Sequence, residues 1–166
     1  MEALYAYSKD EAVGRNAGWK PHESLLESSD ILHLVFLGQS SVWAIERQSD
    51  RRLMGSIGLI TDSARQYGSS RSLGYALGVD YWGQGYMTEA VREAIRFGFR
   101  QMGLDLISAT CYPDNPASRR VLEKCGFQYE GTLHRAELLY NGQVKDHLHF
   151  YLPHEVAQKL DWCAEK

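Results

Sequence analysis

Apolar residues recur along the chain with two different spacings, which predict both helices and strands. One helical stripe runs from a capping-box sequence at Ser24 to about Leu37, and a second covers residues 88–102. The pair Asn141-Gly142 predicts a tight hairpin between the last two strands. Stretches rich in β-forming residues predict strands at 42–47, 53–60, 72–79, 106–111, 127–139 and 144–152.

The remaining segments are shorter, and together the elements predict a fold class. Asn115 and Pro116 have the residue types of an N-cap and a first helical position. The order of elements predicts an α/β fold of the α+β type, with a largely antiparallel sheet at each end and one right-handed crossover in the middle. We expect a single domain over residues 1–153 and a C-terminal helical tail within 154–166. Other expected elements are short helices at 2–8 and 116–124, loops at 14–21 and 61–70, and a terminal helix at 154–162.

Composition limits the class of protein. The chain has 166 residues, of which 44% are hydrophobic and 23% are charged, as in an ordinary globular domain. A net charge of −3 gives no basic field for direct nucleic-acid binding. Three cysteines without a paired spacing, and no signal-peptide pattern, predict a cytoplasmic protein with reduced thiols. No apolar run approaches the ~20 residues that cross a membrane, so no membrane partner is expected.

A glycine-rich segment directly before the 88–102 helix is the strongest chemical signal. Free backbone N–H groups and the positive end of the helix dipole form an anion-binding device there. Gly85 is not followed by Lys-Ser/Thr, so the segment is no P-loop, and it lacks the third glycine of the dinucleotide motif. A phosphate-binding loop and a plain strand-to-helix turn both remain open on this evidence.

The loop Trp82-Gly-Gln-Gly-Tyr-Met87 resembles the pyrophosphate loop of the Gcn5-related N-acetyltransferases, the GNAT superfamily. The wider stretch 74–90 is closer to the RimJ/RimL-like branch of ribosomal-protein alanine acetyltransferases, whose loop reads W-G-x-G-x-A-T-E-A. Two further blocks are similar to that branch: Asn-Pro-Ala-Ser-Arg-Arg-Val-Leu-Glu-Lys-Cys-Gly-Phe at 115–127, and Asn-Gly-Gln-x-x-Asp at 141–146. The resemblance covers about residues 40–152, with its blocks in the family's order.

The resemblance implies a GNAT fold, and the chain departs from the family pattern in three places. The fold would be a mixed, mostly antiparallel, twisted sheet, splayed at its centre, with helices on both faces. The family's first N-terminal strand has no counterpart, because Met1 already lies in what resembles the first helix. Met87 stands where a small residue is usual. Leu122 stands where many members carry a general-acid tyrosine, so that role must lie elsewhere or be absent.

The resemblance also implies acetyl-coenzyme A as cosubstrate, a primary amine as acceptor, and direct transfer without a metal. The strand edge would pair with the pantetheine, the N–H near Leu77 would polarise the thioester carbonyl, and the loop amides would meet the pyrophosphate. The residues expected at the cofactor are Ala76, Leu77, Gly78, Gly83, Gln84, Gly85, Tyr86, Met87, Thr88, Asn115 and Ser118.

Two residues are candidates for catalysis. Glu137 matches the glutamate of the alanine acetyltransferases and would take the amine proton, although an exposed strand glutamate is the simpler interpretation. His134 and Asp146 are weaker alternatives for the same role. Ser118 would hydrogen-bond the departing thiolate, and the alternative is an ordinary residue in the first turn of a helix.

Other reactive side chains favour structural roles. His147 and His149 point to one face of a strand, but no further metal ligand has motif spacing, so we expect no metal site. Cys111 and Cys125 lie among apolar residues and are expected in the core or in a wall, not as nucleophiles. The acceptor itself is left open: a protein N-terminal α-amine, a small amine such as a polyamine, amino acid or antibiotic, or none, if the chain only binds coenzyme A. A homodimer is a further expectation.

Overall fold

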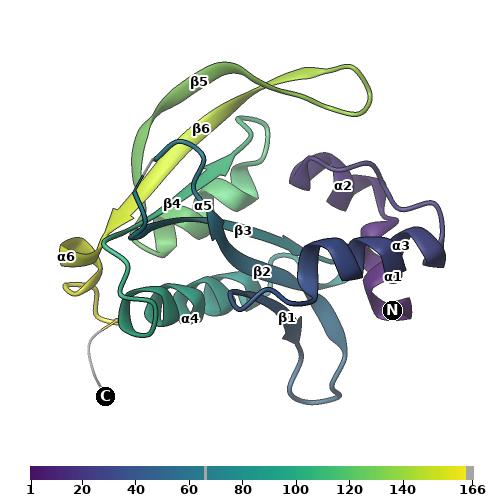
Figure 1. Cartoon of the computed structure of the whole chain (residues 1–166), viewed down its shortest axis with the longest axis horizontal. Helices are drawn as coiled ribbons and strands as arrows, with labels where there is room; N and C mark the ends of the chain where they lie inside the picture. Colours follow the sequence, from purple (N-terminus) through teal and green to yellow (C-terminus); the bar gives the residue numbers. More distant parts are fainter. Residues whose placement is uncertain (66, 164–166) are drawn as a thin grey trace.

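The computed structural model describes residues 1–65 and 67–163. Its centre is a twisted six-stranded sheet of order β1-β2-β3-β4-β6-β5, with helices on both faces (Figure 1). Every neighbouring pair is antiparallel except β3 and β4, which are parallel. The predicted α/β class and the mostly antiparallel sheet are therefore confirmed. The strands are β1 Val42–Glu46, β2 Leu53–Thr61, β3 Ser70–Leu77, β4 Leu106–Cys111, β5 Gln128–Leu138 and β6 Val144–Pro153.

The helices lie in two groups on opposite faces of the sheet (Figure 1). On one side α1 packs on β2, α2 packs on β3 and α3 packs on α1, and on the other side α4 and α5 pack on the sheet. Successive strand residues point to opposite faces, so Ala76 packs with the N-terminal group while Leu77 joins the larger core under α4. The helices are α1 Glu2–Ser8, α2 Glu11–Ala17, α3 Leu25–Ile31, the π-helical turn η1 Leu32–Phe36, the 3-10 turn η2 Val79–Tyr81, α4 Tyr86–Arg100, α5 Pro116–Lys124 and α6 His154–Ala157.

The centre of the sheet opens between β3 and β4. The two strands pair from Ser70–Leu106 as far as Leu73–Ala109, and beyond that point β3 continues to Leu77 without a partner on this side. The sheet is therefore splayed where the parallel pair ends, as the resemblance implies. This gap leaves backbone groups of β3 free to bind something other than a strand.

The N-terminal segment differs from the sequence-based expectation. Residues 14–21 were expected to be a loop, but α2 occupies 11–17, because Asp10 caps the helix by accepting from the N–H groups of Ala12 and Val13. The expected single helix from Ser24 to Leu37 is α3 followed by η1. Its apolar stripe is only partly used, since Leu25 is exposed.

Smaller differences concern where elements begin and end. α4 starts at Tyr86, two residues before the predicted start, because Gly85 forms its N-cap. β3 begins at Ser70 and is followed by the η2 turn rather than extending to Val79. The terminal helix was predicted over 154–162, but α6 ends at Ala157 and turns follow it. Leu160 and Trp162 in those turns pack against the main core.

The pairing of β5 with β6 is irregular just before Glu137, the candidate base. Leu133 pairs with His147 and Glu137 pairs with Lys145. Between these two pairs β5 advances by four residues while β6 advances by two. The extra residues form a bulge in which Arg135 has φ 53°, a left-handed conformation that is uncommon outside glycine. The bulge changes the direction in which the following residues of β5 point.

Candidate active site

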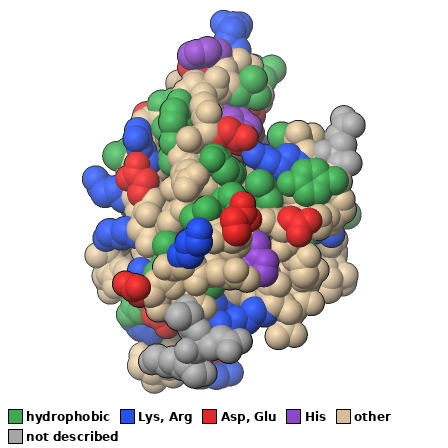
Figure 2. Space-filling model, turned by 90° about the vertical axis from the view of Figure 1, so that its left-hand side faces the viewer, with side chains coloured by type: hydrophobic (Ala, Val, Ile, Leu, Met, Phe, Trp, Pro, Cys, Tyr) green, Lys and Arg blue, Asp and Glu red, His purple; other side chains and the backbone are tan. Residues whose placement is uncertain are grey.

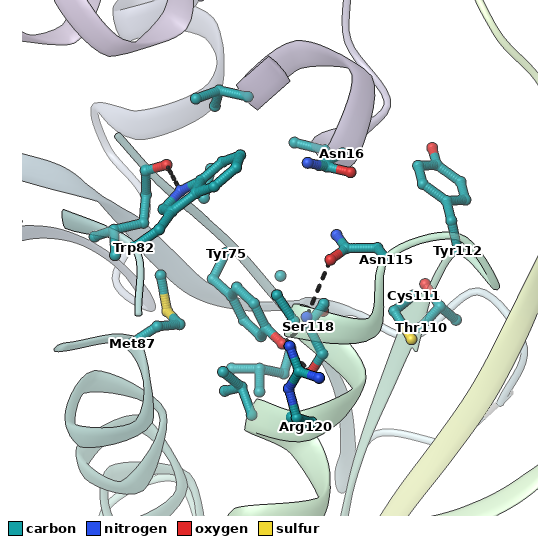
Figure 3. Close-up of a pocket in the computed structure, with 18 of the residues that line it drawn as sticks. Asn16, Tyr75, Trp82, Met87, Thr110, Cys111, Tyr112, Asn115, Ser118 and Arg120 are labelled. Carbon is teal, nitrogen blue, oxygen red and sulfur yellow. Dashed lines mark hydrogen bonds between the residues drawn. The ribbon is translucent and has the colours of Figure 1, made fainter. Parts of the chain in front are cut away.

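A cleft of about 440 Å³ occupies the gap between β3 and β4 (Figure 3). It is lined by residues of α2, β3, the loop before α4, the end of β4, and α5. Glu137 of β5 and His147 of β6 complete one wall. The cleft is thus bordered both by α2 of the N-terminal helices and by α5 of the other group.

The glycine loop presents bare backbone to this cleft. Gly83 and Gly85 have φ values of 73° and 91°, which favour glycine because a Cβ is strained there. A Cβ on either residue would meet no atom within 4 Å, so the backbone faces open space. Gly85 caps the fifteen-residue helix α4 without any side-chain hydrogen bond to its first amides. These amides and the helix dipole fit an anionic group.

The free edge of β3 offers further backbone groups. The N–H of Gly78 bonds to the carbonyl of Met54 on β2 at 2.8 Å. Because successive N–H groups of a strand point to opposite edges, the N–H of Leu77 points toward the gap. The carbonyl of Leu77 accepts a 2.7 Å bond from the indole of Trp82, which fixes the glycine loop to the strand end (Figure 3).

Two basic residues border the same cleft on α5. Arg120 and Lys124 line it beside Ser118 and Val121. The cleft therefore combines a cationic rim, a helix N-terminus and a free strand edge. This set of donors fits a long ligand with phosphate groups at one end and amide groups along its length, as in coenzyme A.

Glu137 is held by two partners on one oxygen. The hydroxyl of Tyr112 donates to Oε2 at 2.7 Å, and Nε2 of His147 lies 2.9 Å from the same oxygen. Burial and the neighbouring carboxylate raise the pKa of Tyr112, so it stays a donor. A Cβ on Gly18, at the end of α2, would lie 3.2 Å from Oε1. The carboxylate is therefore oriented rather than loose, with α2 close beside it.

Ser118 has a partner that the sequence did not indicate. The hydroxyls of Ser118 and Tyr75 lie 2.8 Å apart, and the Ser118 N–H bonds to Oδ1 of Asn115 at 3.0 Å (Figure 3). Asn115 thus caps α5 as predicted. Leu122, at the position of the family's general-acid tyrosine, is fully buried in the core.

Most of the predicted site residues line the cleft, and three do not. Gly78 pairs with β2, the Gln84 side chain donates to the carbonyl of Asp80 at 2.7 Å, and the Tyr86 ring packs edge-on against Tyr81. The predicted residues that line the cleft are Ala76, Leu77, Gly83, Gly85, Met87, Thr88, Asn115, Ser118 and Glu137.

The weaker base candidates lie elsewhere. Nδ1 of His134 and Oδ2 of Asp146 lie 2.8 Å apart, and Oδ1 of Asp146 accepts the N–H of Arg135 at 2.8 Å. Neither His134 nor Asp146 borders the cleft. They stabilise the β5 bulge, so the structure gives them a different position from Glu137.

The cleft residues that the sequence analysis did not single out include three with polar side chains: Asn16, Tyr75 and Tyr112. Tyr75 carried a signal, since a phenol hydroxyl needs a partner on a strand face otherwise occupied by Leu73 and Leu77. Tyr112 also carried a signal, because it directly follows the predicted strand 106–111 and so lies at the end of that strand. Asn16 carried none, because its segment was expected to be a loop.

The cysteines are buried, and His147 lies beside Glu137 in the cleft wall. Burial raises the pKa of Cys111 and of Cys125 to about 11, so both thiols are protonated at neutral pH and are poor nucleophiles. The rings of His147 and His149 lie 6.2 Å apart. Within residues 1–65 and 67–163, no three histidine, cysteine or acidic side chains gather in a metal-binding arrangement.

The splayed sheet, glycine loop and cationic rim define a class, the acyl-coenzyme A-dependent transferases, and sequence comparison identifies the family. Residues 1–128 match the family described as Acetyltransferase (GNAT) domain. The chain therefore belongs to the GNAT acetyltransferases, N-acetyltransferases that use acetyl-coenzyme A.

Individual relatives agree with this assignment. The uncharacterized N-acetyltransferase YoaA of Bacillus subtilis is 30% identical over 149 residues, covering 87% of this chain and 82% of YoaA. The ribosomal protein uS5 alanine N-acetyltransferase of Escherichia coli is 38% identical over 76 residues, 46% of this chain and 39% of that enzyme. The spermidine N-acetyltransferase of Vibrio cholerae, solved with CoA and spermine, shares the fold with a TM-score of 0.79 at 18% identity, covering 95% of this chain and 92% of that one.

The surface agrees with the modest net charge. Acidic and basic side chains are interspersed on the face that Figure 2 shows. Each helix in the described part of the chain is too short or too polar to cross a membrane.

Proposed function

We propose that the chain acetylates the α-amine of a protein or peptide N-terminus. The observation that carries the proposal is Glu137, oriented by Tyr112 and His147 in the cleft that also holds the glycine loop. A carboxylate at this place can take a proton from an attacking amine. The matched stretch of the uS5 alanine acetyltransferase supports a place in the RimJ/RimL-like branch.

The choice of an α-amine follows from acid–base chemistry. An α-amino group has a pKa of about 7.7–8.0, whereas a lysine side chain has one of about 10.4. A useful fraction of α-amines is neutral near neutral pH, so one carboxylate suffices to remove the remaining proton. A lysine acceptor would need far stronger deprotonation than one half-exposed glutamate supplies.

Each group of residues has a defined task in this reaction. Bound acetyl-coenzyme A supplies an activated acetyl thioester. The N–H of Leu77 would donate to the thioester carbonyl, and the amides from Gly83 to Thr88 would hold the pyrophosphate. Glu137 takes one proton from the amine as the N–C bond forms. Ser118 donates a hydrogen bond to the sulfur as the C–S bond breaks. The thiolate then takes a proton from a solvent water, and Glu137 gives its proton to the hydroxide that is left, so protons and charges balance.

The test is coenzyme A release measured with three acceptors. These are a peptide with a free N-terminal alanine, the same peptide with a blocked N-terminus and an internal lysine, and spermidine. We expect release with the free peptide only. Release with spermidine alone would show that the acceptor is a polyamine and not a protein N-terminus. Coenzyme A binding without release for every acceptor would contradict an enzymatic function. A cytoplasmic location and a homodimer remain predictions.

The role of Glu137 is tested by Glu137→Gln. We expect kcat to fall at least about 100-fold, as for loss of a general base, with unchanged affinity for coenzyme A. The control is Glu123→Gln on α5, which removes an exposed carboxylate paired with Arg119 outside the cleft and should leave kcat unchanged. Full activity in Glu137→Gln would exclude the base role.

A further inference from the structure

Tyr75 reaches Ser118 from a different element than the family's usual tyrosine. It lies on β3, in the part of the strand that has no β4 partner, and its ring crosses the cleft floor to α5 (Figure 3). Its hydroxyl lies 2.8 Å from Oγ of Ser118 and 3.3 Å from the Ser118 carbonyl. Leu122 on α5 carries no polar atom and is fully buried. Tyr75 is thus the phenol that this chain brings to Ser118.

The direction of the bond between the two hydroxyls follows from their chemistry. A phenol is the more acidic hydroxyl and therefore the better donor, whereas an aliphatic hydroxyl is the better acceptor. When Tyr75 donates to Oγ, the single proton of Ser118 is free to point into the cleft. When Ser118 donates to Tyr75 instead, that proton is no longer available to a ligand.

We propose that Tyr75 is a positioning residue that directs the Ser118 hydroxyl proton toward the sulfur of coenzyme A. The inference rests on the proposed function and deepens it. Tyr75 passes on no proton itself. Burial raises its pKa, so it keeps its proton and acts as a permanent donor. The C–S bond breaks toward sulfur, Ser118 donates a hydrogen bond to the thiolate, and water supplies the final proton.

The kinetic test is Tyr75→Phe, which keeps the ring and removes the hydroxyl. We expect kcat to fall about tenfold, because the hydrogen bond from Ser118 to the charged thiolate is then no longer held in place, with an unchanged KM for acetyl-coenzyme A. Ser118→Ala should cause a similar loss, and the double variant should lose no more than Ser118→Ala alone. The control is Tyr129→Phe, which removes a hydroxyl bonded to Thr132 at 2.6 Å outside the cleft.

A second readout does not require turnover. Coenzyme A is titrated on the protein while thiolate absorbance is followed, with desulfo-coenzyme A as the reference. Stabilisation of the thiolate should make the bound thiol a stronger acid, and Tyr75→Phe should reduce its acid dissociation constant about tenfold. Absence of turnover in the unmodified protein would contradict the proposed function, while this titration still tests Tyr75.

Three results would overturn the role of Tyr75. One is unchanged kcat and thiol acidity in Tyr75→Phe. Another is a further loss when Tyr75→Phe is added to Ser118→Ala, which would mean that the two hydroxyls act separately. The third is a fall in melting temperature or in coenzyme A affinity that accounts for the lost activity, which would make the role structural.

Discussion

At the scale of single residues, Gly18 decides how closely α2 approaches Glu137. Its φ is +85°, and a Cβ there would lie 2.5 Å from the Tyr112 hydroxyl. Gly18→Ala should therefore displace Tyr112 and break its bond to Glu137. We expect kcat to fall about tenfold and acetyl-coenzyme A affinity to stay unchanged, since a lost bond to a charged group is worth about 1.5 kcal/mol. Steady-state kinetics and calorimetry measure both quantities.

Gly38 provides a matched control. It has φ +81°, but a Cβ there would meet nothing within 4 Å. Gly38→Ala should lose about 1–2 kcal/mol of stability from the left-handed backbone. Gly18→Ala should lose at least as much, because its Cβ also displaces Tyr112. Only Gly18→Ala should lose activity. Equal activity in the two variants would show that the contact with Tyr112 has no effect on catalysis.

At the scale of elements, the β5 bulge carries Glu137 into the cleft, and Asp146 stabilises that bulge. The Arg135 N–H and the His134 side chain hold the pKa of Asp146 below its usual range, so the carboxylate stays charged at assay pH. Asp146→Ala leaves the Arg135 N–H without its acceptor. We expect kcat to fall at least about tenfold, with coenzyme A affinity unchanged, because the bonds that the charged carboxylate accepts from the Arg135 N–H and shares with His134 are both lost.

Two further variants separate the bulge from the hairpin as a whole. Asp146→Asn retains an oxygen for the Arg135 N–H and should recover most of the activity. Asn141→Ala removes a comparable bond, to the Gln143 N–H at 3.0 Å, at the hairpin tip. It should leave kcat unchanged. A similar loss in Asn141→Ala and Asp146→Ala would indicate general hairpin loosening instead of control of Glu137.

At the scale of the whole molecule, His22 ties the N-terminal helices together on the sheet. Its backbone N–H donates to the carbonyl of Ser8 in α1, and its ring Nδ1 lies 2.7 Å from the Ser28 hydroxyl in α3. Burial lowers the pKa of His22 below its ordinary value. The folded chain therefore resists protonation that the unfolded chain accepts, and stability falls as the pH drops below about 6.5.

His22→Asn removes this titration while keeping a polar group near Ser28. We expect the melting temperature of the unmodified chain to exceed that of His22→Asn at about pH 8, and the difference to shrink toward about pH 5.5. His149, whose pKa is also lowered by burial, is present in both proteins and cancels. A difference that stays constant with pH would contradict this account.

The sequence predicted the site unevenly, for a physical reason. Gly83, Gly85 and Asn115 act through their own backbone or the adjacent helix, so local patterns predicted their positions. Helix α2 was missed because its signal, Asp10 before a short polar segment, is weak. The β5 bulge has no signal in the alternation of β5 itself and depends on Asp146 across the hairpin.

The sequence alone determined the class of fold, the family blocks and the glycine loop, because these depend on residues close together along the chain. Only the tertiary structure decided which partners surround the reactive groups. Tyr75 meets Ser118 across 43 positions, and Tyr112 meets Glu137 across 25. Such pairs depend on strand order, on the point where β3 and β4 separate, and on the bulge in β5. These features are set by packing of the whole domain, which no local pattern records.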